Sequence, residues 1–369
     1  MKGTIGRYGP SCGGVRPEVG RRHSRPTRHF LPPTSKPNAF FAICSLFRYS
    51  RTSMKVVLSG ATGLIGRALV ADLLSDGHEV VALSRSERAA RARLDPGGSH
   101  RGLAVVEWDA RSAAGLTPAL AGCDAVVNLV GENLTGGRWT AAKKRLLLES
   151  RLDAVNAFAE ALRTMTPSAR PSVFVQASAV GYYGSRGDEP LAESAEGGAG
   201  LLAEIARRCE ERAAPVASFG VRLVAARTGV VLAREGGALP RLALPSRLGV
   251  GGYPGNGAQV VSWIHLADEV RALRFLIDRP NLAGAFNLTA PEAVSMKELT
   301  RVIGLTLHRP LLVPIPSFVM HLAFGEMADE ALLSGQRVAP ERLLAAGFSF
   351  RFPEIAAALR DLLRTLREE

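Results

Sequence analysis

The sequence has few of the residues that define disulfide-rich, metal-binding or membrane-spanning proteins. Its 369 residues include four cysteines, Cys12, Cys44, Cys123 and Cys209, and no two of them have the spacing of a C-x-x-C redox or zinc motif. The apolar patch NAFFAICSLF is about half as long as the ~20 residues that a membrane span needs. We therefore expect reduced thiols, no bound metal and no membrane-spanning segment.

Acidic residues are nearly absent from the first 53 positions. This segment holds ten Lys or Arg and one acid, Glu18, so it carries +9 of the total net charge of +12. The remainder is close to neutral, which gives no support to nucleic-acid binding by a folded domain. We expect residues 1–53 to be disordered, either as a region upstream of a start at Met54 or as an organellar transit peptide. The first alternative predicts a cytoplasmic protein.

Regular patterns begin at Met54. The β-branched run KVVLSG is followed by a glycine turn, by the helical pattern RALVADLLSDGH and by a second strand, EVVALSR. This βαβ unit and the later apolar runs predict an α/β fold, a Rossmann-type doubly wound parallel sheet. We assign this domain to residues 54–288 and a small, mostly helical C-terminal lobe to residues 289–369.

The glycine turn has the pattern G-x-x-G-x-x-G, with Gly60, Gly63 and Gly66 between the first strand and the first helix. Glycines allow the backbone to approach a pyrophosphate closely, and the helix start supplies N–H groups to it. The turn also contains Thr62, Leu64 and Ile65. We predict dinucleotide binding here; the alternative is a turn that only joins strand to helix.

The end of the second strand indicates which dinucleotide binds. NAD-binding domains place an acid there for the ribose 2′-hydroxyl, whereas this chain has Ser84 and Arg85, which suit a 2′-phosphate. The prediction is NADP(H). Glu87, two residues further, leaves NAD open.

Several longer motifs resemble one protein family. GATGLIG, LVGE, GRWT, ESR, SAVGYYG, RTGVVL, SWIHLADEV, GAFNLTAP, GEMA and SGQRVAPERLLAAGFSFRFP are similar to an atypical branch of the extended, epimerase-like short-chain dehydrogenase/reductases that has a C-terminal domain of unknown function. The resemblance runs from about Met54 to the C-terminus.

The resemblance implies further cofactor contacts. Asp109 and Ala110 would flank the adenine, Glu132 and Arg138 would contact the cofactor, and Val180 would lie near the nicotinamide. Each has a plainer alternative: Asp109 could cap a turn, Arg138 could be a solvated charge, and Val180 could belong to the core.

The catalytic couple of that superfamily is missing. Its active members use a tyrosine and a lysine four residues later, which lowers the pKa of the tyrosine. None of the five tyrosines here is followed by lysine at that spacing, and no lysine occurs between Lys144 and Lys297. By resemblance, Leu202 and Ala206 stand at the positions of the couple.

Three hydroxyl groups remain as candidates for catalysis: Ser178 to polarise a carbonyl, and Tyr183 or Tyr182 to donate a proton. A tyrosine without its lysine can donate a proton but is a poor base near pH 7. We therefore expect NADPH-dependent reduction of a small carbonyl compound. The alternative for the tyrosine pair is packing beneath the nicotinamide pocket.

Two other functions stay open. A non-catalytic NADP-binding regulatory or interaction protein is the main alternative, and an epimerase is the further one. Val260 and Val261 stand where relatives have an arginine for a nucleotide diphosphate, which argues against a sugar-nucleotide substrate. We expect a monomer or homodimer.

Two C-terminal patterns predict structural roles. His265 and Asp268 are expected to orient the C-terminal part of the chain. Met320, Phe324 and Met327, spaced at i, i+4 and i+7, are expected to be buried in the core; the alternative is a substrate lid.

Overall fold

The protein divides into two units, Met1–Arg51 and Thr52–Glu369. A computed structural model describes residues 53–135, 137–309 and 313–363, all of which belong to the second unit. The predicted disorder of the basic N-terminal segment, together with Cys12 and Cys44, lies outside these residues.

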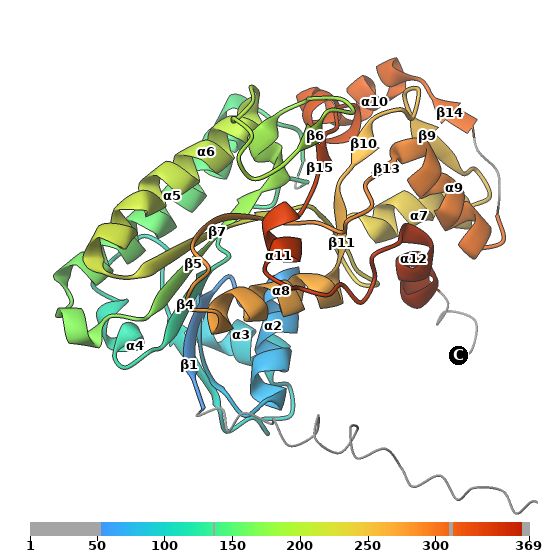
Figure 1. The fold of residues 1–369 in the computed structure, drawn as a ribbon. Coiled ribbons are helices and arrows are strands. Elements are labelled where there is room, and N and C mark those ends of the chain that lie inside the picture. The colour runs from blue at the N-terminus through green and yellow to red at the C-terminus, as the bar shows by residue number, and fades with distance from the viewer. Residues whose placement is uncertain (1–52, 136, 310–312, 364–369) are drawn as a thin grey trace, which may run out of the picture. The chain divides into compact units, whose positions relative to one another are not determined.

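Seven parallel strands form the central sheet of the second unit (Figure 1). In chain order they are β1 (Lys55–Ser59), β2 (Glu79–Ser84), β3 (Leu103–Glu107), β4 (Ala125–Asn128), β5 (Val173–Ala179), β7 (Arg222–Thr228) and β12 (Gly284–Leu288). Their spatial order is β12-β7-β5-β4-β1-β2-β3. The strand order therefore reverses between β1 and β4, where doubly wound sheets bind their ligands. The predicted fold class is confirmed.

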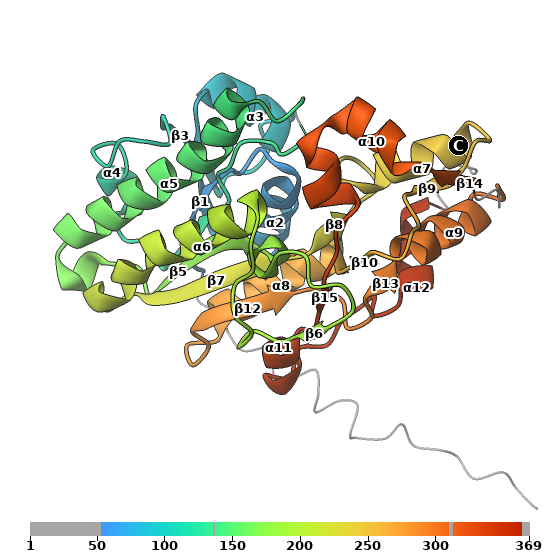
Figure 2. The same cartoon turned by 90° about the horizontal axis from the view of Figure 1, so that it is seen from above.

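Helices cover both faces of this sheet (Figure 2). The helices of the domain are α2 (Leu64–Ser75), α3 (Glu87–Leu94), α4 (Thr117–Leu120), α5 (Ala141–Thr164), α6 (Leu201–Ala213) and α8 (Leu266–Asp278). Side chains alternate along each strand, so Val56 and Leu58 join the core beneath α2 and α8, whereas Val57 joins the core beneath α4 and α5. Burial on both faces explains why the strands are nearly continuous apolar runs.

A second, smaller core lies beside the sheet domain, with the fully buried Trp263 in it. Its elements are α7 (Leu239–Arg247), β10 (Val260–Val261), β11 (Trp263–His265), β13 (Val294–Ser295), α9 (Met296–Thr306) and α12 (Ile355–Leu363). Short strands β8 (Val230–Leu232), β9 (Gly252–Pro254) and β14 (Val313–Ile315) complete it. The mostly helical lobe predicted after residue 289 thus shares its core with segments that precede that residue.

His265 and Asp268 join the two parts of the fold. The His265 ring stacks on Phe352 with 3.9 Å between centroids, and its Nε2 lies 3.2 Å from Asp361 Oδ2. Burial lowers the pKa of His265 despite that carboxylate. Asp268 accepts hydrogen bonds from the backbone N–H groups of Arg351 and Phe352 at 2.8 and 2.7 Å. Both residues orient the C-terminal part, as predicted.

The expected burial of the Met/Phe triplet is correct for two of its three members. Met320 and Met327 are 7% and 6% exposed, but Phe324 is 39% exposed. The helix α10 (Ser317–Phe324) ends before Gly325, whose φ is 61°, so the helical spacing relates Phe324 to Met320 but not to Met327. Met327 is buried by contacts outside α10, and Phe324 lies on the exposed last turn of the helix.

Within the described ranges, no helix is long and apolar enough to cross a membrane, and no group of side chains has the composition of a metal site. Cys123 and Cys209 are buried and unpaired. Burial raises the pKa of Cys123 to about 12 and that of Cys209 to about 11, so both are thiols at neutral pH.

One fully buried acid stands near the carboxyl end of β7. Glu269, in the first turn of α8, accepts a hydrogen bond from Thr228 Oγ1 at 2.8 Å through Oε1, while its Oε2 has no partner among the described residues. Burial raises the pKa of Glu269 to about 8. The folded protein therefore keeps this carboxyl protonated near neutral pH.

This proton predicts a pH-dependent stability. The folded-state pKa lies above the unfolded value of 4.5, so the stabilisation is fully present below pH 4.5 and is lost as pH rises towards 8. Relative to Glu269→Gln, wild type should lose ~1.4 kcal/mol of unfolding free energy per pH unit within that window. Urea unfolding at pH 5.5, 6.5 and 7.5 measures the difference. Parallel curves for the two proteins would contradict the assignment.

Candidate functional site

The glycine turn follows β1 and leads directly into α2. Gly60 has a φ of 72°, which favours glycine, and a Cβ on it would lie 2.7 Å from the carbonyl oxygen of Leu129 after β4. A Cβ on Gly66 would lie 2.3 Å from the Gly60 carbonyl oxygen. These glycines therefore let the turn, the helix and the neighbouring strand approach one another closely.

The start of α2 is open. Its N-cap is Gly63, no side chain caps the helix, and its first turn contains no acid. The first N–H groups of a helix need partners from outside it, and the helix dipole makes the position favourable for an anion. The turn thus fits a pyrophosphate, which is the group the glycine pattern predicted.

The next two strands end at the same edge of the sheet. Ser84 is half-buried at the end of β2, and the following Arg85 is exposed. Beyond β3, Asp109 accepts hydrogen bonds from the backbone N–H groups of Arg111 and Ser112, both at 2.8 Å, and these bonds lower its pKa. Ala110 has a φ of 65°, unusual for a residue other than glycine. Asp109 therefore does cap a turn, at the edge where the adenine contact was predicted.

The loop after β4 is clamped onto α5. The backbone N–H of Glu132 donates to Ser150 Oγ at 3.1 Å, and its carbonyl accepts from Arg151 Nη2 at 3.1 Å. The Glu132 carboxylate pairs with Lys143 Nζ at 2.5 Å, and that lysine side chain is 13% exposed. The Arg151 guanidinium packs against Gly131, where a Cβ would lie 2.6 Å from its Cζ. The ESR motif therefore fixes the position of Glu132.

Arg138 and Val180 lie apart from this clamp. Arg138 is exposed and donates to the backbone carbonyl of Leu322 on α10. Val180 is 7% exposed at the start of a 3-10 turn, η2 (Val180–Tyr183), and packs with Tyr183, Leu191 and Val338. In this structure Val180 contributes to a small core.

A row of polar side chains crosses the sheet beneath the cleft. Ser59, Asn128 and Gln176 are register partners on β1, β4 and β5, and all three are buried. Ser59 Oγ donates to Asn128 Oδ1 at 2.6 Å, and Asn128 Nδ2 donates to Gln176 Oε1 at 2.8 Å. The row ties together the three strands on both sides of the reversal point.

A second polar network lies beneath the SAVGYYG segment, and Tyr183 is inside it. The Tyr183 ring is fully buried, its hydroxyl donates to Asn287 Oδ1 at 2.7 Å, and it accepts from Arg227 Nη1 at 2.9 Å. Burial raises the pKa of Tyr183, although the bonds from Arg227 and Asn287 oppose the shift. This geometry gives Tyr183 a structural position with no exposed hydroxyl.

Arg227 is the centre of this network. It makes two hydrogen bonds of 2.8 Å to the Glu210 carboxylate and one of 3.2 Å to the Glu193 carbonyl. Burial lowers the pKa of Arg227, but the bonds and charge of Glu210 outweigh it and raise the pKa above its usual value. The guanidinium also lies 3.5 Å from the centroid of the Tyr182 ring.

The Glu210 carboxylate also binds the hydroxyl group of Ser178. Ser178 Oγ donates to Glu210 Oε1 at 2.6 Å, so its proton is not available to polarise a carbonyl in this arrangement. Tyr182 differs from both other candidates, since its half-buried hydroxyl has no hydrogen-bond partner within the described residues. Of the three hydroxyl groups singled out in the sequence, only that of Tyr182 is uncommitted.

One face of α6 contains the two positions at which the resemblance places the catalytic couple. Leu202, Ala206 and Glu210 follow one another at i, i+4 and i+8, so they lie on one face of the helix. The positions expected for the couple hold apolar groups, and the next turn holds the acid that binds Ser178 and Arg227. This face therefore supports the network.

Sequence reasoning missed Glu193, Glu210, Arg227 and Asn287. Arg227 has a detectable signal, because a lone arginine near the end of the buried run VRLVAART needs an anionic partner inside the fold. Its partner Glu210 lies in a charged helix, ARRCEER, where nothing distinguishes it from solvated neighbours. The pairing depends on tertiary structure alone.

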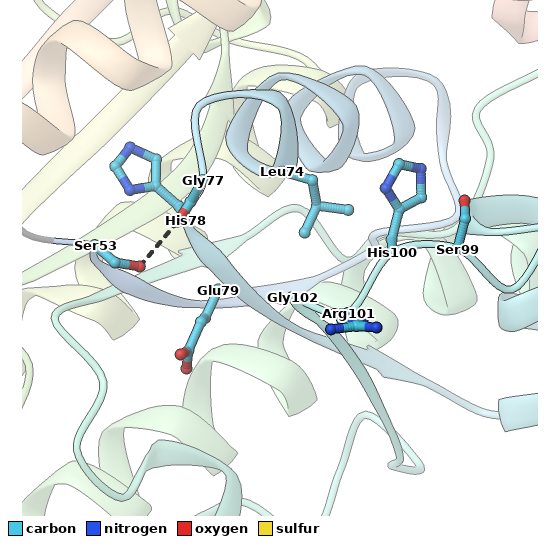
Figure 3. A pocket seen from close by; sticks show the side chains of 9 residues that line it. All are labelled: Ser53, Leu74, Gly77, His78, Glu79, Ser99, His100, Arg101 and Gly102. Carbon is cyan, nitrogen blue, oxygen red and sulfur yellow. Dashed lines mark hydrogen bonds between the residues drawn. The ribbon is translucent and has the colours of Figure 1, made fainter.

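A shallow depression elsewhere does not belong to this site. Figure 3 shows its lining, which includes Ser53, His78, Glu79 and Arg101, with Ser53 Oγ donating to the carbonyl of Gly77. These residues precede β1, β2 and β3 or stand at their first positions, so the depression lies at the edge of the sheet opposite the strand ends described above.

The two tyrosines provide a matched test of the network. Tyr183→Phe removes the donor to the buried Asn287 Oδ1 and one acceptor of Arg227 Nη1, and should lower the unfolding free energy by ~1–3 kcal/mol. Tyr182→Phe keeps the aromatic ring on Arg227 and should change the unfolding free energy by less than ~0.5 kcal/mol. Urea denaturation measures both. Equal effects of the two substitutions would be inconsistent with the described hydrogen bonds.

Two family models match the chain. Residues 56–288 match the NAD dependent epimerase/dehydratase family, and residues 315–362 match a domain of unknown function, DUF1731. An epimerase family protein of Mycobacterium bovis is 40% identical over 304 residues, which are 82% of this chain and 96% of the relative. An Arabidopsis thaliana relative named as a chloroplastic homologue of SDR39U1 is 33% identical over 92% of this chain and 94% of its own length.

A solved structure extends the comparison. The crystal structure of human epimerase family protein SDR39U1, isoform 2, with NADPH superposes with a TM-score of 0.73 at 32% identity, covering 85% of this chain and all of that one. Sequence motifs, sheet topology and both family matches agree with the predicted resemblance. The chain belongs to the NAD dependent epimerase/dehydratase family, in the branch that carries the DUF1731 domain at its C-terminus.

Proposed function

We propose that this protein binds NADP(H) at the carboxyl edge of its sheet and uses NADPH to reduce a small carbonyl compound. The observation that carries the proposal is the uncapped start of α2 behind three glycines, at the reversal point between β1 and β4. The human relative was crystallised with NADPH, which favours the same cofactor here.

The residues around Arg85 favour the 2′-phosphate. Arg85 is exposed and Ser84 adjoins it. Glu87, which had left NAD open, bonds Arg91 Nε through Oε1 at 2.8 Å on the exposed side of α3. With that carboxylate engaged, the end of β2 presents the exposed guanidinium of Arg85 as a phosphate-binding group, while the Ser84 hydroxyl donates to the Ser86 carbonyl at 3.2 Å.

Bound NADPH would supply a hydride to the carbonyl carbon, and the chain would have to supply a proton to the carbonyl oxygen. We assign that proton to Tyr182, because the hydroxyl groups of Ser178 and Tyr183 are already committed to Glu210 and Asn287. The Arg227 guanidinium lies 3.5 Å from the centroid of the Tyr182 ring, and this contact positions the ring.

One observation supports the second candidate, a non-catalytic NADP-binding regulatory or interaction protein. The network around Arg227 uses two of the three hydroxyl groups near the expected catalytic position for structural purposes. Epimerisation ranks below both, because it also needs a base, and the helix that carries the catalytic couple in relatives has Leu202 and Ala206 at those positions. A cytoplasmic location remains our proposal, and the chloroplastic relative favours the organellar alternative for residues 1–53.

Nucleotide titration tests the cofactor assignment. In Arg85→Ala we expect a loss of ~1.5–3 kcal/mol from charged hydrogen bonds to phosphate, which is a drop of roughly 10- to 100-fold in NADPH affinity with little change for NADH. Arg93→Ala, an exposed arginine at the far end of α3, is the matched control and should bind normally. NADPH fluorescence measures both. Equal binding of NADPH by wild type and Arg85→Ala would refute the phosphate site.

Turnover separates the two candidate functions. With a panel of short aldehydes and ketones, Tyr182→Phe should lower NADPH oxidation by about 10²-fold or more, the usual contribution of a positioned proton donor. Stopped assays at equal folded-protein concentration should show a much smaller effect for Tyr183→Phe. If wild type binds NADPH but none of the aldehydes and ketones leads to NADPH oxidation, the non-catalytic candidate is favoured.

A further inference from the structure

The C-terminal domain of unknown function places one segment over the starts of α5 and α6. This segment, residues 317–333, comprises α10 and the π-turn η4 (Ala328–Leu332). Figures 1 and 2 show α10 among the elements of the C-terminal part of the chain. We call it the latch segment.

Glu330 of the latch segment completes α6. Its two carboxylate oxygens accept hydrogen bonds from the backbone N–H groups of Leu201 and Leu202, at 2.8 and 3.0 Å. The N-cap of α6 is Gly200, which has no side chain to perform this role and whose φ is 107°. A Cβ on Gly200 would lie 2.9 Å from Glu330 Oε1. The helix thus receives its capping carboxylate from a residue about 130 positions away.

Further contacts join the latch segment to the β4–α5 loop. Met327 is buried among Trp139, Leu147, Ile205 and Cys209. Lys144 pairs with Glu326, and Arg138 donates to the Leu322 carbonyl. Arg138 therefore belongs to both the latch contacts and the predicted cofactor contacts, and Lys144 adjoins the lysine that holds Glu132.

The outer part of the latch segment is weakly packed. Met320 is the only buried residue among the eight of α10, while Phe318 and Leu322 are 70% and 74% exposed. An element with few buried apolar contacts opens locally at a low free-energy cost. The contacts that hold the segment lie mostly in its second half: Met327 and Ala328 are buried, Glu326 and Glu330 pair with α5 and α6, and the Leu332 carbonyl accepts from Gln259 Nε2 at 2.7 Å.

We propose that the latch segment is a gate on the nucleotide cleft, closed by the carboxylate of Glu330 on the start of α6. Opening frees the first turn of α6 and the side chain of Arg138, and closing fixes both at once, whereas Glu132 stays bound to Ser150, Arg151 and Lys143. The gate rests on the proposed nucleotide site, whereas the latch itself rests on contacts within the chain.

Hydrogen exchange of the full chain without nucleotide tests the latch. In Glu330→Ala, the amides of Leu201, Leu202 and the latch segment should exchange at least about tenfold faster than in wild type. Glu330→Gln keeps one acceptor oxygen, so its amide exchange rates should lie between those of wild type and Glu330→Ala. If Glu330→Ala fails to fold, Glu330→Gln is compared with wild type instead. Asp329→Ala is the matched control, because its partner His321 lies within the same segment. Wild-type exchange rates in both Glu330 variants would overturn the latch.

Stopped-flow release of NADPH tests the gate. We expect dissociation from Glu330→Ala to be at least about fivefold faster than from wild type, and dissociation from Asp329→Ala to stay within twofold. If Glu330→Ala exchanges its amides faster but releases NADPH at the wild-type rate, the gate is overturned and the latch is supported. If wild type binds no NADPH, the proposed function and the gate both fail, and hydrogen exchange still decides the latch.

Discussion

The buried guanidinium of Arg227 constrains much of the carboxyl edge of the sheet. A charge inside the fold must be paired and fully hydrogen-bonded, and here the partners come from α6, η2 and the Glu193 carbonyl. The demand fixes Glu210 on the face of α6 that also carries Leu202 and Ala206, and it holds Tyr183 in the interior. The network around the Arg227 charge thus engages the hydroxyl groups nearest to the expected reaction centre in hydrogen bonds.

The other half of the edge retains the features of a nucleotide site. Gly60 and Gly66 permit the close turn, α2 begins without a cap, and the strand ends of β2, β3 and β4 bring Arg85, Asp109 and Glu132 to one side of the sheet. The row from Ser59 to Gln176 fixes the strands beneath them.

Local signals in the sequence predicted what local physics determines. The glycine turn and the βαβ unit depend on residues close together in the chain, and both are present in the structure as expected. The Arg227–Glu210 pair and the Glu330 cap join residues 17 and about 130 positions apart, so no helical or strand period relates the partners. The Met/Phe spacing failed because α10 ends before Met327 and exposes Phe324. The lobe core draws on segments before residue 289 for the same reason: its pairing is tertiary.

The central proposal is that the glycine turn and the neighbouring strand ends bind NADP(H), while Tyr183 is held inside the fold and Tyr182 donates the proton. A crystal structure of the protein with NADPH tests it most directly. The account predicts the pyrophosphate on the amide groups that begin α2, with Tyr183 still bonded to Asn287 and Arg227 beneath the nicotinamide end. A structure in which Tyr183 has left that network and contacts the nicotinamide ribose would contradict it.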